Sequence, residues 1–167
     1  MSMIRLILGI DPGLGHTGWG VIAQDGNRLS FIAAGRISPD AKLAMAERLC
    51  VLAEGVVAAV GKYRPHEAAI EETFVNKNAL SALKLGQARG AAMLTLAQAG
   101  LSVAEYASNS IKQSVTGYGH ADKRQIQVMI GVLLPGSGKL AADAADALAV
   151  AVTHAHHTPQ TRAKVRA

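Results

Sequence analysis

Residues 3–13 have the sequence MIRLILGIDPG, which predicts a buried β-strand with an abrupt end. The apolar run stops at Asp11, because a Pro-Gly pair follows. Trp19–Gln24 and Leu29–Ile37 are the next predicted strands, and Asp25-Gly26-Asn27 between them is typical of a hairpin turn. Short connections between these three strands predict an antiparallel meander at the start of the fold.

The rest of the chain alternates helical and strand patterns. Ser38-Pro39-Asp40 is typical of a helix start, and the apolar spacing predicts a helix that continues to about Tyr63. Glu67–Glu72 predicts a short buried strand, which the preceding helix would place parallel to the first strand. The remaining predicted elements are a helix over Asn78–Gly100, a strand over Leu101–Ala107, and helices over Ser108–Val115, Ala121–Leu134 and Leu140–His156. We therefore expect an α/β fold, a five-stranded mixed sheet flanked by helices on both faces.

The composition is typical of one folded domain. The chain has 167 residues, of which 50% are hydrophobic and 17% charged, which is enough apolar content for a packed core. We expect one domain over residues 1–157 and a disordered basic tail over residues 158–167. Gly90–Ala104 is the longest uncharged stretch and is too short for a membrane span, and no signal-peptide core precedes Asp11. These features favour a cytoplasmic protein, and a single cysteine, Cys50, excludes a disulfide framework or a cysteine-based zinc site.

The charge is basic and unevenly distributed. The formal net charge is +5, and between Phe74 and Ala142 seven Lys or Arg residues face only two acids, Glu105 and Asp122. A basic balance favours a polyanionic partner, although an ordinary solvated surface explains the charge equally well at this stage.

Acidic residues end two of the predicted strands. Asp11 ends the first, and Glu71 and Glu72 end the fourth. Parallel strands bring their carboxyl ends to one edge of a sheet, where ligands collect. We therefore expect Asp11 to lie near one of the two glutamates, and the pattern leaves open which of them points toward it. A turn and a solvated strand end are the simpler explanations of these acids.

A second pair of acids lies on the last predicted helix. Asp143 and Asp146 are three residues apart in an Ala-rich stretch, so they share a face with Cβ atoms about 5–6 Å apart. Helix capping would explain them singly, but with Asp11 and a glutamate they form a set of carboxylates at one sheet edge. Such oxygen ligands suit Mg²⁺ or Mn²⁺, and with a basic surface they suggest two-metal phosphodiester hydrolysis.

Four motifs in this order resemble the RuvC family of Holliday-junction resolvases, which belongs to the RNase H-like superfamily. They are Gly9-Ile10-Asp11-Pro12-Gly13, Ala69-Ile70-Glu71, residues 81–90 (SALKLGQARG) and residues 143–149 (DAADALA). Several nucleotide-binding folds share the first, whereas the central-helix motif and the Asp-Ala-Ala-Asp motif are specific. The resemblance extends from about Met3 to His157.

The resemblance implies an Mg²⁺-dependent homodimeric endodeoxyribonuclease. It would resolve four-way DNA junctions by paired near-symmetric nicks, leaving 5′-phosphate and 3′-OH ends for recombination and repair. The family's catalytic residues, which are also its ligands for two Mg²⁺ ions (or Mn²⁺), match Asp11, Glu71, Asp143 and Asp146. Phe74 matches a base-stacking aromatic, and Lys112 and Lys123 match lysines that contact DNA near the cut. A branch-migration complex of the RuvAB type is the implied partner.

The long central helix carries two further expectations. Leu80, Leu83 and Leu94 are among the apolar residues expected to pack in the core. Gly86 and Gly90 allow a close approach, either to the sheet or to a second copy across a two-fold axis.

Three other functions were compatible with parts of the pattern. A hydrolase of RNA/DNA hybrids would share the fold and the acids, but the central-helix motif and Phe74 argue against it. A non-catalytic junction-binding dimer would have no use for four carboxylates on apolar elements. An actin-like ATPase needs a longer, two-domain chain.

Overall fold

The structure is a computed structural model that describes residues 3–72 and 78–158. Within these residues, the strands of a single sheet are β1 (Arg5–Asp11), β2 (Thr17–Asp25), β3 (Arg28–Ile37), β4 (Glu67–Glu71) and β5 (Val103–Tyr106). The order across the sheet is β3-β2-β1-β4-β5. The first three strands are antiparallel, and β4 and β5 continue the sheet parallel to β1. The predicted five-stranded mixed sheet and its opening meander are confirmed.

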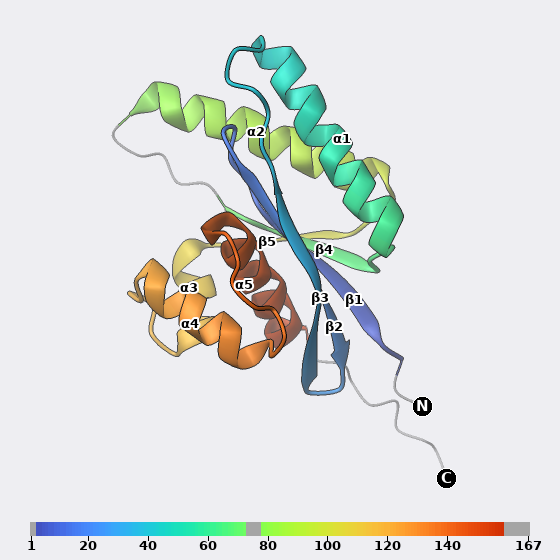
Figure 1. Ribbon diagram of the computed structural model, residues 1–167, viewed down its shortest axis with the longest axis vertical. Helices are drawn as coiled ribbons and strands as arrows, with labels where there is room; N and C mark the ends of the chain where they lie inside the picture. The colour runs from blue at the N-terminus through green and yellow to red at the C-terminus, as the bar shows by residue number, and fades with distance from the viewer. Residues whose placement is uncertain (1–2, 73–77, 159–167) are drawn as a thin grey trace.

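Helices cover both faces of the sheet (Figure 1). In the described part of the chain they are α1 (Met45–Tyr63), α2 (Ala79–Gln98), α3 (Ser108–Thr116), α4 (Lys123–Leu133) and α5 (Ala142–His157). Helices α1 and α2 lie on one face, and α5 lies on the other with α3 and α4 beside it. The buried apolar residues accordingly form two clusters, one with α1 and α2 and one with α5.

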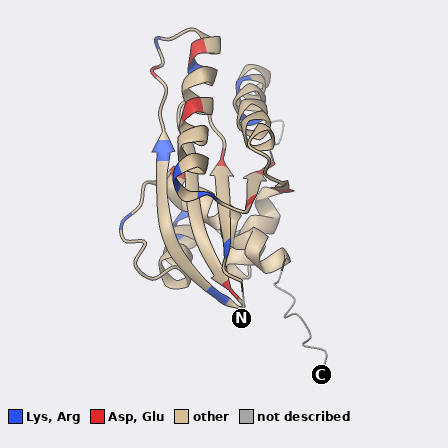
Figure 2. Cartoon of the chain, turned by 90° about the vertical axis from the view of Figure 1, so that its right-hand side faces the viewer, with Lys and Arg blue, Asp and Glu red and all other residues tan. Residues whose placement is uncertain are grey.

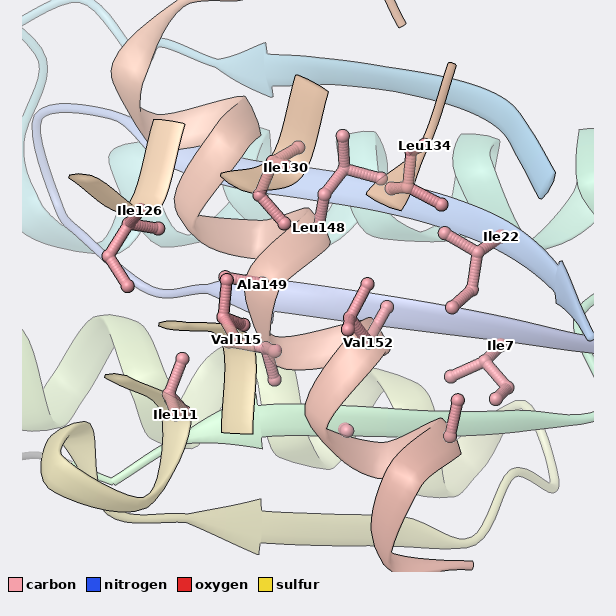
Figure 3. Packing of buried hydrophobic residues seen from close by; sticks show 14 of the residues in the cluster. Ile7, Ile22, Ile111, Val115, Ile126, Ile130, Leu134, Leu148, Ala149 and Val152 are labelled. Carbon is pink, nitrogen blue, oxygen red and sulfur yellow. The ribbon is translucent and has the colours of Figure 1, made fainter. Parts of the chain in front are cut away.

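Helix α5 lies unusually close to the sheet. A Cβ atom at Gly9 of β1 would overlap the carbonyl oxygen of Ala147, and one at Gly18 of β2 would overlap that of Asp143. Glycine at these two positions lets the backbone of α5 rest directly on β1 and β2. Figure 3 shows how apolar side chains of α5 fill the space between the sheet and the neighbouring helices. This contact fixes where the first turn of α5 meets the ends of the strands.

The start of α1 differs from the prediction. The helix was expected to begin at residues 38–40, but it begins at Met45. The carboxylate of Asp40 accepts a backbone hydrogen bond within its own turn, which keeps this segment out of the helix. The Glu47 carboxylate instead accepts from the backbone N–H of Ala44 at 2.9 Å and thereby caps the helix start.

The packing predicted for α2 is confirmed for Ala88 but wrong for three of its leucines. Leu80, Leu83 and Leu94 were expected in the core, yet they are 61%, 61% and 59% exposed. The helix packs through its opposite side, whose buried residues are Ala88, Ala92, Thr95 and Leu96. Gly86 and Gly90 are exposed as well, and a Cβ atom at either would have no neighbour within 4 Å, so close packing of these glycines on the sheet is excluded.

Two predictions fall on residues outside the described ranges. These are the base-stacking role of Phe74 and the disordered tail, of which only Thr158 is described. Both stay predictions.

None of the helices within residues 3–72 and 78–158 is long and apolar enough to cross a membrane.

Candidate active site at the carboxyl ends of the strands

Asp11 and Glu71 end neighbouring parallel strands and point to the same face of the sheet. On β1, Gly9 faces α5, so Asp11 two residues later shares that face. On β4, Ala69 belongs to the cluster packed around α5, so Glu71 shares the face as well, whereas Glu72 lies beyond the strand. Figure 2 shows acidic positions at the carboxyl ends of two strands of the sheet. Strand alternation therefore answers the question that the sequence left open, and Glu71 is the glutamate beside Asp11.

The N-terminal part of α5 brings two more carboxylates to this edge. Asp143 and Asp146 lie on α5 where the helix rests on β1 and β2, and their side chains are 29% and 17% exposed. The charges of both act on Asp11, as does that of Glu71. Thus the structure brings together the four acids that the sequence singled out.

The crowding of these acids shows most clearly at Asp11. Burial raises the pKa of its carboxyl to about 8, and the nearby charges of Glu71, Asp146 and Asp143 add to this effect in that order. Lys123 opposes the shift. At neutral pH, the protein without a bound cation therefore favours the protonated form of Asp11.

The two acids that flank Asp11 are shifted in the same direction. Burial is the first cause of the raised pKa of Glu71 and of Asp146, and like charges add to it. A hydrogen bond from Ser108 lowers the pKa of Glu71, and the ammonium of Lys123 lowers that of Asp146. Neither effect outweighs burial, so the pKa of both carboxyls stays raised, and a further cation would favour their ionised forms.

A cleft of about 340 Å³ contains Asp11, Glu71 and Asp146 together with both predicted DNA-contacting lysines, Lys112 and Lys123. The Lys123 Nζ lies 3.4 Å from Asp146 Oδ2, and this carboxylate is the main reason why the pKa of Lys123 is raised. The cleft therefore combines acids that can hold cations with cations that can hold phosphate.

The described acids are close enough to repel one another, but their side chains are not arranged as a complete metal-binding site. Among the residues that the structure describes, no group of three or more Asp, Glu, His or Cys side chains is already arranged so that it could hold a metal ion. Asp143 illustrates this arrangement, because it does not line the cleft and instead lies 3.8 Å from the Arg36 Nη1.

Sequence reasoning missed three residues around the site. Ser108, which was noted only as a helix start, hydrogen-bonds Glu71. Arg89 was quoted as part of the central-helix motif, and its Nε donates to the backbone carbonyl of Glu71 at 3.0 Å. Arg36 was not singled out at all, and its position after the apolar residues of a predicted strand was the available signal.

Comparisons with known proteins show the family of the chain. The family model described as "Crossover junction endodeoxyribonuclease RuvC" matches residues 7–154. The chain belongs to the RuvC family. RuvC of Afipia carboxidovorans is 59% identical over 151 residues, which cover 90% of this chain and 88% of that protein. RuvC of Rhodopseudomonas palustris (strain BisA53) is 60% identical over 151 residues, which cover 90% of this chain and 87% of that protein.

Solved structures support the same placement. Thermus thermophilus RuvC, solved in complex with a Holliday junction substrate, has a TM-score of 0.85 and 31% identity, covering 92% of this chain and 94% of that one. The yeast mitochondrial Holliday junction resolvase Ydc2 has a TM-score of 0.63, covering 88% of this chain and 77% of that one, and at 10% identity it shows the shared fold alone. The RuvC-family chain described here thus has the RNase H-like fold that the motifs implied.

Proposed function

We propose that the chain resolves four-way DNA junctions by two near-symmetric nicks, each of which leaves a 5′-phosphate and a 3′-OH. The observation that carries this proposal is the cleft, where acids with raised pKa values lie beside two lysines in a RuvC-family chain. Buried carboxylates that repel one another weaken a fold unless something binds them. Their retention here supports a function for them as ligands.

We infer that the divalent cations are two Mg²⁺ ions per site, or Mn²⁺ in their place, held by Asp11, Glu71, Asp143 and Asp146. The donor set fits, because these cations prefer oxygen ligands and Mg²⁺ usually keeps several waters, so one or two carboxylates per ion suffice. The described acids lie near one another, but no three of them surround a common metal position. Such an arrangement fits ions that keep several of their water ligands. When bound, the ions supply an activated water and charge stabilisation for the leaving oxygen.

The lysines of the cleft have a different task. Lys112 and Lys123 lie beside the acids and can bind the phosphates of the strand to be cut. Lys123 also offsets the charge of Asp146 in the free protein. These contacts orient the scissile phosphate over Asp11, and they make binding sensitive to salt.

Paired nicks need two active sites, and the exposed side of α2 supports a homodimer. The spacing of three and four residues places Leu80, Leu83, Gly86, Gly90 and Leu94 on one side of this helix, and all are exposed. An apolar side with glycines at its centre suits close contact with the same helix of a second copy around a two-fold axis. We expect Leu83→Glu to produce a monomer in analytical ultracentrifugation, whereas Val132→Glu, at a 64% exposed residue on α4, leaves the dimer intact.

Three further parts of the proposal rest on the family resemblance. Phe74, outside the described residues, would stack on an unpaired base at the junction centre. A branch-migration complex of the RuvAB type would deliver the junction. Chromosomal DNA as substrate would place the activity in the cytoplasm.

A strand-resolved cleavage assay tests the proposed function. The protein is mixed with Mg²⁺ and, separately, a mobile four-way junction, its linear duplex arms and an RNA/DNA hybrid, and each strand is labelled in turn. We expect paired nicks at symmetric positions in the junction only. Cutting of the hybrid alone would reassign the site to RNA removal, and tight junction binding without any cutting would favour a non-catalytic dimer.

A further inference from the structure

Arg36 lies at the same edge of the sheet as the acids. Strand β3 is antiparallel to β2, and β2 is antiparallel to β1, so β3 and β1 run in the same direction. The carboxyl end of β3, where Arg36 lies, therefore reaches the edge that holds Asp11 and Glu71. Figure 2 shows a basic position at the arrowhead of a strand at this edge.

Strand alternation directs Arg36 toward the face of α5. Its neighbours Gly35 and Ile37 face the other way, since a Cβ atom at Gly35 would meet the Trp19 ring and Ile37 contacts Gly55 of α1. Arg36 is thus directed toward α5, and its Nη1 lies 3.8 Å from Asp143 Oδ2.

No side chain on β2 separates Arg36 from α5. Its partner in the ladder is Gly18, the residue that lets the backbone of Asp143 rest on the sheet. The guanidinium is therefore held beside the first turn of α5, although its side chain remains 48% exposed.

Arg36 lies outside the cleft that contains Lys112 and Lys123, because neither Arg36 nor Asp143 lines that cleft. Strand β3 is two strands away from β1, which is about 10 Å at the usual spacing. The imidazole of His16 belongs to the same side as Arg36, because its Nδ1 lies 2.8 Å from the Oγ of Ser38, just beyond β3.

We propose that Arg36 binds a backbone phosphate of the cleaved strand beside Asp143, outside the cleft that contains Lys123. This inference rests on the proposed function, because the ligand is a phosphodiester of the junction. Arginine suits the task, since its planar guanidinium can donate two parallel hydrogen bonds to one phosphate. The strand would be held by Arg36 in addition to the lysines of the cleft, which limits its movement across the site.

The contact with Asp143 alone does not account for the residue. An ion pair this exposed contributes little to stability. Once Asp143 is engaged with a cation, its charge is compensated and the guanidinium is available to a phosphate.

The first test compares the salt dependence of junction binding. All variants carry Glu71→Gln so that strands stay intact, and binding to a labelled four-way junction in Mg²⁺ is measured by fluorescence anisotropy over a series of salt concentrations. Arg36→Gln is expected to reduce the slope of log K against log salt by about 0.9, the value for one phosphate contact. Arg36→Lys should restore the slope. Arg28→Gln is the matched control, because Arg28 is exposed at the other end of β3 and its loss should leave the slope unchanged.

A second test locates the contact. Single phosphates on either side of the cut are replaced by neutral methylphosphonates, and the loss of affinity is compared between Arg36 and Arg36→Gln proteins. We expect one position at which the replacement weakens the Arg36 protein but leaves Arg36→Gln unaffected.

Three results would overturn the inference. An unchanged salt slope in Arg36→Gln would do so, as would an equal loss in Arg28→Gln, which would mean that net charge alone matters. A lowered cleavage rate of Arg36→Gln at saturating junction, measured in protein that retains Glu71, together with an unchanged slope would make Arg36 a partner of Asp143 and nothing more. Failure of the proposed function is distinct, since it would appear as no preference of the protein with Arg36 intact for junction over duplex.

Discussion

Glu67 and Glu71 lie on the same face of β4, four residues apart, yet the fold treats them in opposite ways. The Glu67 carboxylate accepts a hydrogen bond from His154 Nε2 at 2.5 Å and lies 3.4 Å from the Arg5 guanidinium. Glu71 lies among acids, and its pKa is raised. Helix α5 contributes to both surroundings, through His154 near its end and through Asp143 and Asp146 near its start.

The difference shows where the fold neutralises its own charges. At the Glu67 end, Arg5 also donates to Gln24 and Thr158, and the Tyr106 hydroxyl lies 2.9 Å from His154 Nδ1, so the buried polar groups hold one another. At the Glu71 end, the four acids have fewer cations nearby: Lys112 and Lys123 in the cleft and the exposed Arg36. Because the chain does not fully compensate the negative charges at the Glu71 end, these charges can attract an external cation.

The largest effect should come from removing a carboxylate at the Glu71 end. We expect Asp11→Asn to lower junction cleavage by about 1,000-fold or more, because a cation ligand is lost while the shape is kept. Glu71→Gln, Asp143→Asn and Asp146→Asn should behave alike, and all should still bind the junction. Glu67→Gln is the matched control, with the cleavage rate per folded molecule expected to stay at the wild-type value. If any of the four acid variants cleaved the junction at the wild-type rate, the replaced residue would not be a cation ligand.

The next effect concerns pH and stability without added metal. The folded-state pKa of Asp11, about 8, lies above the unfolded value near 4, so the folded protein holds the proton more tightly. The free energy of unfolding in EDTA should therefore fall as pH rises from about 4 to 8. Urea denaturation across this range should show that fall in the wild type and a flatter profile in Asp11→Asn, and Mg²⁺ at pH 8 should restore stability. Identical profiles for the two proteins would mean that Asp11 is not the group responsible.

The Glu67 end should respond in stability rather than in chemistry. Glu67→Gln weakens an ion pair and a short hydrogen bond between partly buried groups, so we expect a loss of about 1–3 kcal/mol in the free energy of unfolding. Chemical denaturation measures this change at pH 7. No loss of stability would show that Arg5 and His154 find other partners.

The smallest effect should come from the lysines of the cleft. Lys112→Gln or Lys123→Gln should reduce the salt slope of junction binding by about 0.9 each. Arg124→Gln, next to Lys123 but outside the lining of the cleft, serves as the control. A slope that stays at the wild-type value would mean that neither lysine contacts a phosphate and that both are ordinary surface residues.

Much of the fold was predictable because local rules and tertiary packing agree. The hairpin at residues 25–27 and the capping box of Asp122 with Gln125 formed as their sequences predict. The start of α1 was mispredicted because Asp40 and Glu47 offer competing caps, and the chain uses Glu47. For Leu80 and Leu83, hydrophobicity predicted burial, but it does not say whether the covering surface belongs to the same chain or to a second copy.

The sequence by itself determined which acids this protein has and, through its motifs, the family to which it belongs. The resemblance implied Glu71 rather than Glu72, but the residue pattern left the choice open, because β4 is covered on both faces and shows no polar alternation, and the tertiary structure gave the physical reason for Glu71. Only the tertiary structure decided that Arg36 lies beside Asp143, because Gly18 lets α5 rest on a strand far away in sequence. The sequence states which charged residues are present, but the pKa and the partners of each depend on segments that are far apart in the sequence.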